Sequence, residues 1–196
     1  HLHVAGEAVY IDDILEARGT LHAAFGLSER AHARIRGLDL APVRAAPGVL
    51  AVLTAADIPG ENNVGPIVHD DPILADGEVQ YLGQPIFLVV ADTVDHARRA
   101  ARLARVDYED LPAILTIEEA LAQGSFVIPT VTLERGDAKA AIAGAPHRLK
   151  GALRIGGQEQ FYLEGQIAYA VPKEDGDMLV YNSTQHPGEG QLQVAH

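Results

Sequence analysis

Neutral amide side chains in the second half of the chain have the chemistry best suited to holding a cofactor. Gln158, Gln160 and Gln166 lie in the stretch GGQEQFYLEGQ, and Gln185 lies in the stretch STQHP. Each amide offers two donors and an acceptor and adds no charge. Such groups suit a site that orients an anionic, metal-bearing cofactor, because their donors stabilise oxo ligands where negative charge develops. The alternative is that these glutamines satisfy strand edges, and the residues alone favour that alternative.

Other reactive side chains do not form a recognisable site. None of the nine histidines belongs to an HExxH sequence or another close ligand pair on a helix face. His69, Asp70 and Asp71 are expected to lie in a solvated acidic loop, and Asp12 and Asp13 in a turn. No GxGxxG or P-loop sequence is present. The sequence therefore predicts no metal ligand and no catalytic residue in this chain.

Composition limits the class of protein. The 196 residues are 47% apolar, which is enough for an ordinary folded core, and the net charge of −12 argues against nucleic-acid and anionic-membrane partners. Without cysteine, the chain can carry neither an iron–sulfur cluster nor a thiolate nucleophile. No apolar run approaches the ~20 residues of a membrane span, and the start does not resemble a secretory signal. The expected compartment is therefore the cytoplasm.

The first half of the chain reads as an α+β domain. A helix with Thr93 as its N-cap is predicted over 94–105, with Val94, Ala97, Ala101 and Ala104 on its apolar side. Together with its two flanking strands, this helix forms either a parallel βαβ crossover or an antiparallel equivalent. A short helix is predicted over 40–46, and strands over 8–11, 20–28, 33–40, 48–53, 85–91 and 106–112.

The second half alternates short helices and strands. One helix ends at Gly124, and a second runs from an Asp137 cap to Gly144. Strands are predicted over 147–155, 165–172 and 178–184, the last two joined by the turn KEDGD. The final helix, from Pro187, has about two turns and no C-cap, too short to stand alone in water. We therefore expect the chain to be part of a longer polypeptide, and pairing of its exposed edge with a second copy stays open.

Several stretches resemble one enzyme family. GEAVYIDDI, LHAAFGLSERAHARIRGLDL, APGVLAVLTAADIPG, YLGQPIFLVVA and VDYEDLPAILTIEEAL resemble the hammerhead domain that opens the molybdenum-binding subunit of xanthine dehydrogenases and aldehyde oxidases. GGQEQFYLEGQIAYAVP and STQHP are similar to the start of that subunit's molybdopterin-binding region. The resemblance implies an α+β fold class: a hammerhead-type α/β domain over 1–115, a linker over 116–132, and the incomplete start of a molybdopterin-binding α+β domain over 133–196.

The resemblance also implies a function. Family members hydroxylate an electron-poor C–H of a purine or aldehyde at molybdopterin-bound molybdenum, with oxygen from water, and iron–sulfur, FAD and nicotinamide centres elsewhere take the electrons. By this resemblance, Gln185 is the one cofactor-binding residue, and it hydrogen-bonds an oxygen ligand of the molybdenum. The implied substrates are hypoxanthine and xanthine, in purine catabolism, and the implied partner is the iron–sulfur/FAD subunit.

Two alternatives stay open. The substrate is an aldehyde or another N-heterocycle, or the chain is a non-catalytic scaffold or assembly module with this fold. The remaining site residues of the family lie beyond His196, so the chain alone is expected to bind no cofactor and to be inactive.

Overall fold

The chain was analysed as a computed structural model, which describes residues 1–65 and 67–195. By its internal contacts it divides into two compact units. The first unit combines His1–Ala113 with Glu164–His196, and the second is Ile114–Leu163. The two units are defined by contacts between residues and do not mark evolutionary domains. The predicted domains 1–115 and 133–196, with the linker 116–132, therefore stay predictions. Each unit is described by itself.

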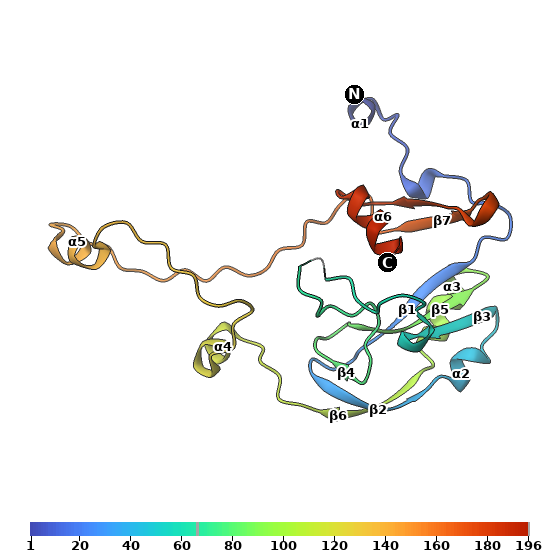
Figure 1. Cartoon of the computed structure of the whole chain (residues 1–196), viewed down its shortest axis with the longest axis horizontal. Helices are drawn as coiled ribbons and strands as arrows, with labels where there is room; N and C mark the ends of the chain where they lie inside the picture. The colour runs from blue at the N-terminus through green and yellow to red at the C-terminus, as the bar shows by residue number, and fades with distance from the viewer. Residues whose placement is uncertain (66, 196) are drawn as a thin grey trace. The chain divides into compact units, whose positions relative to one another are not determined.

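Two three-stranded antiparallel sheets form the body of the first unit (Figure 1). The first sheet has the order β1-β5-β3 and the second the order β4-β2-β6. The strands are β1 (His22–Leu27), β2 (Ala33–Asp39), β3 (Val49–Thr54), β4 (Glu78–Val79), β5 (Pro85–Ala91) and β6 (Arg105–Asp110). The predicted strands over 20–28, 33–40, 48–53, 85–91 and 106–112 are confirmed, with small shifts at their ends.

The link from β5 through helix α3 (Val94–Ala101) to β6 follows neither of the two arrangements left open by the sequence. The two strands belong to different sheets. Because β5 pairs with β1 on one edge and β3 on the other, no edge of it is free for β6, which pairs with β2 instead. The helix is therefore a connection between sheets.

The core is centred on β5 and α3. Ile86, Phe87 and Val89 of β5 are at most 1% exposed, and α3 packs against β1 and β5. The side chain of Thr93 accepts a hydrogen bond from the His96 N–H at 3.1 Å, which confirms the predicted N-cap.

The far end of α3 and one residue of its predicted apolar side differ from the prediction. The helix ends at Ala101 because Arg105 already belongs to β6, so the predicted extension to 105 is wrong. Ala97 and Ala100 are buried, whereas Val94 is 41% exposed at the first turn. Ala101 and Ala104 are partly buried and pack against the core, so the predicted stripe is confirmed except at Val94, and Ala100 adds to the buried side.

Short helical segments connect these strands. The predicted helix over 40–46 is present as α2 (Ala41–Arg44), and η2 (Ala55–Asp57) follows β3. At the start of the chain are α1 (Leu2–Ala5) and η1 (Ile11–Asp13). The predicted strand over 8–11 is wrong, because the Tyr10 N–H donates to the Asp13 carboxylate and closes a tight turn there.

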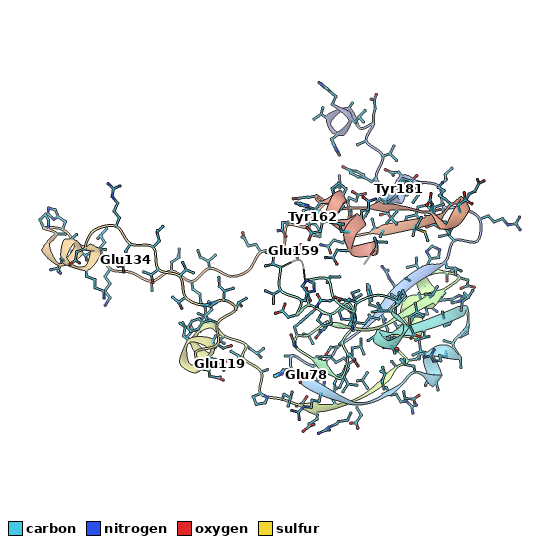
Figure 2. All side chains as sticks on the ribbon, in the orientation of Figure 1. Glu78, Glu119, Glu134, Glu159, Tyr162 and Tyr181 are labelled. Atoms are coloured by element: carbon cyan, nitrogen blue, oxygen red, sulfur yellow. The ribbon has the colours of Figure 1, made fainter. Side chains whose placement is uncertain are left out.

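The remainder of the first unit is a hairpin and a helix. Strands β7 (Ala168–Pro172) and β8 (Met178–Asn182) pair antiparallel, as predicted. The turn between them contains η3 (Glu174–Gly176), in which Asp175 and Gly176 have φ values of 60° and 84°. Tyr169 stacks on Tyr181 across the hairpin with ring centroids 6.0 Å apart, and Figure 2 labels Tyr181 on this sheet. Helix α6 (Pro187–Ala195) follows.

The second unit consists of two short helices joined by extended chain (Figure 1). Helix α4 (Ile117–Gln123) ends at Gly124 and α5 (Ala138–Gly144) is capped by Asp137, both as predicted. The Thr116 side chain caps α4, which was not predicted. The predicted strand over 147–155 is not formed, because no described strand pairs with it. Almost every side chain of this unit is exposed.

Candidate cofactor-contacting site

The loop between β8 and α6 carries Gln185, and backbone hydrogen bonds fix its shape. The Ser183 N–H donates to the Ile167 carbonyl at 3.2 Å, and the Ile167 N–H donates to Ser183 Oγ at 3.0 Å. Thr184 Oγ1 then accepts from the His186 N–H at 3.0 Å, which bends the chain. The loop is thus held at both of its ends, and Gln185 lies at the bend.

The start of α6 explains why the loop ends where it does. Pro187 occupies the first position of the helix, where its missing N–H costs no hydrogen bond. The His186 carbonyl accepts from the Gly190 N–H at 3.0 Å and so makes the first bond of the helix. The chain must leave the strand direction between Asn182 and Pro187, which leaves Gln185 outside both elements.

The Gln185 side chain is exposed and makes no hydrogen bond to the residues that the structure describes. Its donors and acceptor are therefore available to a ligand. An amide buried in the apolar interior could not contact a cofactor. The Gln185 amide is not buried. That Gln185 contacts molybdopterin-bound molybdenum stays a prediction.

A hollow of about 600 Å³ lies beside this loop, between β8 and α6. Most of its polar lining is neutral, from Asn182, Thr184 and Gln191, with Asp177 as the charged exception. Gln185 itself is not among the lining residues. Nearby, His186 Nδ1 lies 3.7 Å from Glu189 Oε2 in the first turn of α6. The hollow beside the loop is thus lined mainly by neutral polar groups, whereas the Glu189 carboxylate lies close to Gln185 in the first turn of α6.

The other three glutamines singled out by the sequence have no such setting. Gln158 and Gln160 are exposed residues of the second unit, and Gln166 is an exposed residue of the first. None of the three side chains forms a hydrogen bond within residues 1–65 and 67–195, so they do not satisfy strand edges there either.

Among the described residues, the buried side-chain amide is that of Gln84, which was not among the predicted site residues. Gln84 is 1% exposed, and its Oε1 accepts from the Gln80 N–H at 2.7 Å. The signal in the sequence is its position. Gln84 directly precedes the continuous apolar run PIFLVVA, which forms the buried strand β5.

The polar stretch GGQEQFYLEGQ contains one residue with a definite structural role. Glu164 Oε1 accepts a hydrogen bond from the Ile11 N–H at 2.8 Å, and the Tyr169 hydroxyl nearby accepts from the Ala17 N–H at 2.9 Å. These bonds tie the N-terminal segment to the hairpin region of the same unit. No sequence pattern signals contacts between residues so far apart in the chain.

The described residues contain neither a cluster of metal-ligating side chains nor a helix able to span a membrane. Within the described residues, no group of three or more His, Asp or Glu side chains is placed to hold a metal ion. No helix in the same part of the chain has the length and apolar content needed to cross a membrane.

Two family profiles match the chain in succession. The profile of the aldehyde oxidase and xanthine dehydrogenase a/b hammerhead domain matches residues 5–112, and that of the molybdopterin cofactor-binding domain matches residues 121–196. The chain therefore belongs to the aldehyde oxidase and xanthine dehydrogenase family. It has a hammerhead domain followed by the start of a molybdenum cofactor-binding domain, and the predicted fold class and family are confirmed.

Individual relatives show the range of this family. The chain is 44% identical to the xanthine dehydrogenase/oxidase of Mus musculus over 195 residues, covering 99% of this chain and 14% of the mouse protein. It is 45% identical to the nicotinate hydroxylase hnxS of Emericella nidulans over 195 residues, covering 96% of this chain and 14% of that protein. The crystal structure of quinoline 2-oxidoreductase from Pseudomonas putida 86 superposes with a TM-score of 0.82 at 29% identity, covering 99% of this chain and 27% of that one.

The chain thus spans about 14% of the length of these curated relatives. The similarity of the chain to these relatives shows that it belongs to a family of molybdenum hydroxylases, which are oxidoreductases.

Proposed function

We propose that this chain is the hammerhead domain and the first part of the molybdopterin-binding domain of a molybdenum hydroxylase that oxidises hypoxanthine and xanthine with oxygen from water. The observation that carries the proposal is the 44% identity to a xanthine dehydrogenase/oxidase along 99% of this chain. Similarity along the full length, across both domains, is what descent from a common enzyme produces.

Gln185 is the residue of this chain that we assign to the cofactor. When bound, the molybdenum cofactor supplies the redox chemistry by which an electron-poor C–H is hydroxylated. The Gln185 amide would donate a hydrogen bond to an oxygen ligand of the metal and would leave the net charge of the site unchanged. Its exposed position, and the absence of a hydrogen bond from its side chain to any described residue, support this role.

Electron transfer in this proposal depends on groups outside the chain. Iron–sulfur clusters need thiolate ligands, and the chain has no cysteine. The clusters and FAD would therefore lie on other domains or on a partner subunit, and the assembled enzyme would work in the cytosol. Since a single amide does not bind a cofactor, we expect the 196-residue chain alone to retain no molybdenum, which metal analysis of the purified chain tests directly.

A second candidate substrate class is another N-heterocycle or an aldehyde. The 45% identity to a nicotinate hydroxylase supports an N-heterocycle as strongly as the 44% identity to the mouse enzyme supports a purine. The family profile also names aldehyde oxidases. Steady-state kinetics of the longer protein that carries this chain, with xanthine, nicotinate and benzaldehyde, would separate these classes. Absence of molybdenum from that protein would instead support the non-catalytic scaffold.

The Gln185 assignment is tested by Gln185→Ala in the same longer protein, with Gln166→Ala as the matched exposed control. We expect kcat to fall about 10- to 100-fold for Gln185→Ala, as for other hydrogen-bond partners of metal ligands, with molybdenum content unchanged. Gln166→Ala should leave kcat unchanged. Equal kcat values for the two variants would show that Gln185 does not act on the cofactor.

A further inference from the structure

Residues 147–155 have the sequence of a half-buried strand, but they are not paired with any described strand. In HRLKGALRI, the apolar or small residues Leu149, Gly151, Leu153 and Ile155 alternate with Arg148, Lys150, Ala152 and Arg154. This period of two places the first set on one face of a strand and the second on the other. The ribbon of Figure 1 shows the segment between α5 and β7 as extended chain without an arrow.

The apolar face of this segment is uncovered. Leu149 is 105% exposed, Leu153 is 85% exposed and Ile155 is 76% exposed. Isolated exposed leucines are ordinary, but three on one face of a nine-residue amphipathic segment form an interaction surface. The unpaired backbone of an extended segment also offers a row of N–H and C=O groups to a neighbouring strand.

The other face of the segment carries positive charge in a chain that is acidic overall. Arg148, Lys150 and Arg154 give the segment three cations and no carboxylate, in a chain whose net charge is −12. The contact of Arg154 with Glu118, at 3.8 Å between side chains that are 85% and 72% exposed, is a solvated pair of little energetic weight. The cations are therefore available to carboxylates on a neighbouring strand.

Charge argues against a second copy of this chain as the neighbour. An antiparallel pair centred on Gly151 would place Arg148 of one copy opposite Arg154 of the other. A parallel pair in register would place each cation beside its own equivalent. Like charges directly opposite one another destabilise a strand pair, so the fitting neighbour is a strand with acidic residues at those positions.

We propose that residues 147–155 become a strand by adding to the edge of a sheet that lies outside this chain, in the remainder of the molybdenum enzyme, with acidic residues opposite Arg148, Lys150 and Arg154. This rests on the proposed function, because the occupant is polypeptide of the same enzyme. The length of the relatives, of which this chain covers about 14%, provides ample chain for such a sheet. Main-chain hydrogen bonds hold the added strand, and the alternate side chains select the edge.

Hydrogen–deuterium exchange tests the pairing. In the isolated chain we expect the amides of 148–155 to exchange at rates near those of an unfolded peptide. In the full-length enzyme we expect exchange slowed by at least about 100-fold. Protection in the isolated monomeric chain would place the partner strand within this chain and overturn the proposal, as would protection that rises with chain concentration. Unprotected amides in the full-length enzyme would also overturn it.

Two matched substitutions test the faces of the strand in the full-length enzyme. Leu153→Asp places a carboxylate on the apolar face and should remove the protection of 148–155. Ala152→Asn places a neutral polar side chain of the same size one residue away, on the basic face, and should preserve protection. Protection that survives Leu153→Asp would contradict the proposed orientation.

The charge of the partner is tested by the double substitution Arg148→Glu with Lys150→Glu, against Arg148→Gln with Lys150→Gln. The glutamate variant should lose far more protection than the glutamine variant, and high salt should narrow the difference. Equal losses would show that no acidic edge lies opposite.

The outcomes separate this inference from the proposed function. Strand protection in a full-length protein without molybdenum or xanthine oxidation would support the pairing and refute the function. An active, molybdenum-loaded enzyme with unprotected 148–155 would refute the pairing alone.

Discussion

The Glu164 carboxylate accepts a hydrogen bond from the backbone N–H of Ile11 at 2.8 Å, although the two residues are 153 positions apart in the chain. The hammerhead profile begins at residue 5, and the segment just after that point is bonded to Glu164, which lies within the region 121–196 matched by the cofactor-binding profile. The beginning of the hammerhead domain and the later part of the cofactor-binding region therefore belong to one compact unit, whereas the start of that region, 121–163, belongs to the other.

Glu164→Ala should release this segment. The Ile11 N–H would lose a charged acceptor in a partly buried position, which costs about 1–2 kcal/mol of local stability. Hydrogen exchange of residues 10–17 should become faster. Glu164→Gln, whose amide oxygen still accepts a hydrogen bond, should show a smaller change. Identical exchange in the wild type and Glu164→Ala would mean that the bond does not hold the segment.

Gly26→Ala should destabilise the hammerhead core. A Cβ at Gly26 would lie 2.0 Å from Phe87 Cζ, and the Phe87 ring is 1% exposed and cannot move into solvent. Overpacking of this kind costs about 1–3 kcal/mol. Gly37→Ala is the matched control in another strand, since its Cβ would meet only Asp107 Cβ, at 3.6 Å. Urea denaturation should show a lower midpoint for Gly26→Ala alone.

Gln84→Met keeps the size of the side chain and removes its hydrogen bonding. The Gln80 N–H would lose its acceptor at 2.7 Å inside the fold, a loss of about 1–3 kcal/mol in the free energy of unfolding. Gln80→Met changes the exposed partner side chain and leaves that hydrogen bond in place, so its unfolding should match the wild type. A wild-type urea midpoint for Gln84→Met would show that water replaces the lost acceptor.

His32 makes the stability of the first unit dependent on pH. Hydrogen bonds of its ring to the Pro112 carbonyl, at 2.7 Å, and to the Glu78 carboxylate, at 3.2 Å, raise the pKa of His32 above its ordinary value of 6.5. The folded state therefore favours the imidazolium. Its contribution to stability is complete below pH 6.5 and is lost as the pH rises through the folded pKa.

The measurement is the urea midpoint of the wild type and of His32→Gln across about pH 5.5 to 8.5. The advantage of the wild type should be largest at the acidic end and should shrink as the pH rises. An advantage that stayed constant or grew with pH would contradict the assigned direction of the shift.

Local patterns in the sequence predicted much of the fold. The apolar run of β5, the Thr93 and Asp137 caps and the turn KEDGD each depend on neighbouring residues, and each is present. The partners of the strands were not predictable in the same way. That β6 pairs with β2 follows from the occupied edges of β5, which is a property of the assembled sheet.

The candidate site shows the same division between local and long-range information. The bend that exposes Gln185 follows from neighbouring residues, because the Thr184 hydroxyl and Pro187 lie beside it in sequence. The separation of Gln158 and Gln160 from Gln166 into different units, and the contact of Glu164 with Ile11, depend on the path of the whole chain. For the same reason 147–155 had the right pattern for a strand but no partner among the described residues.

The loop that carries Gln185 is held by the Ser183 and Thr184 hydroxyls, which are engaged with the main chain. It is therefore preorganised, and a ligand that meets Gln185 would lose little affinity to the entropy of ordering the loop. Sequence variation in relatives of this protein should accordingly be restricted at Ser183 and Thr184, because their hydroxyls hold the loop in one shape.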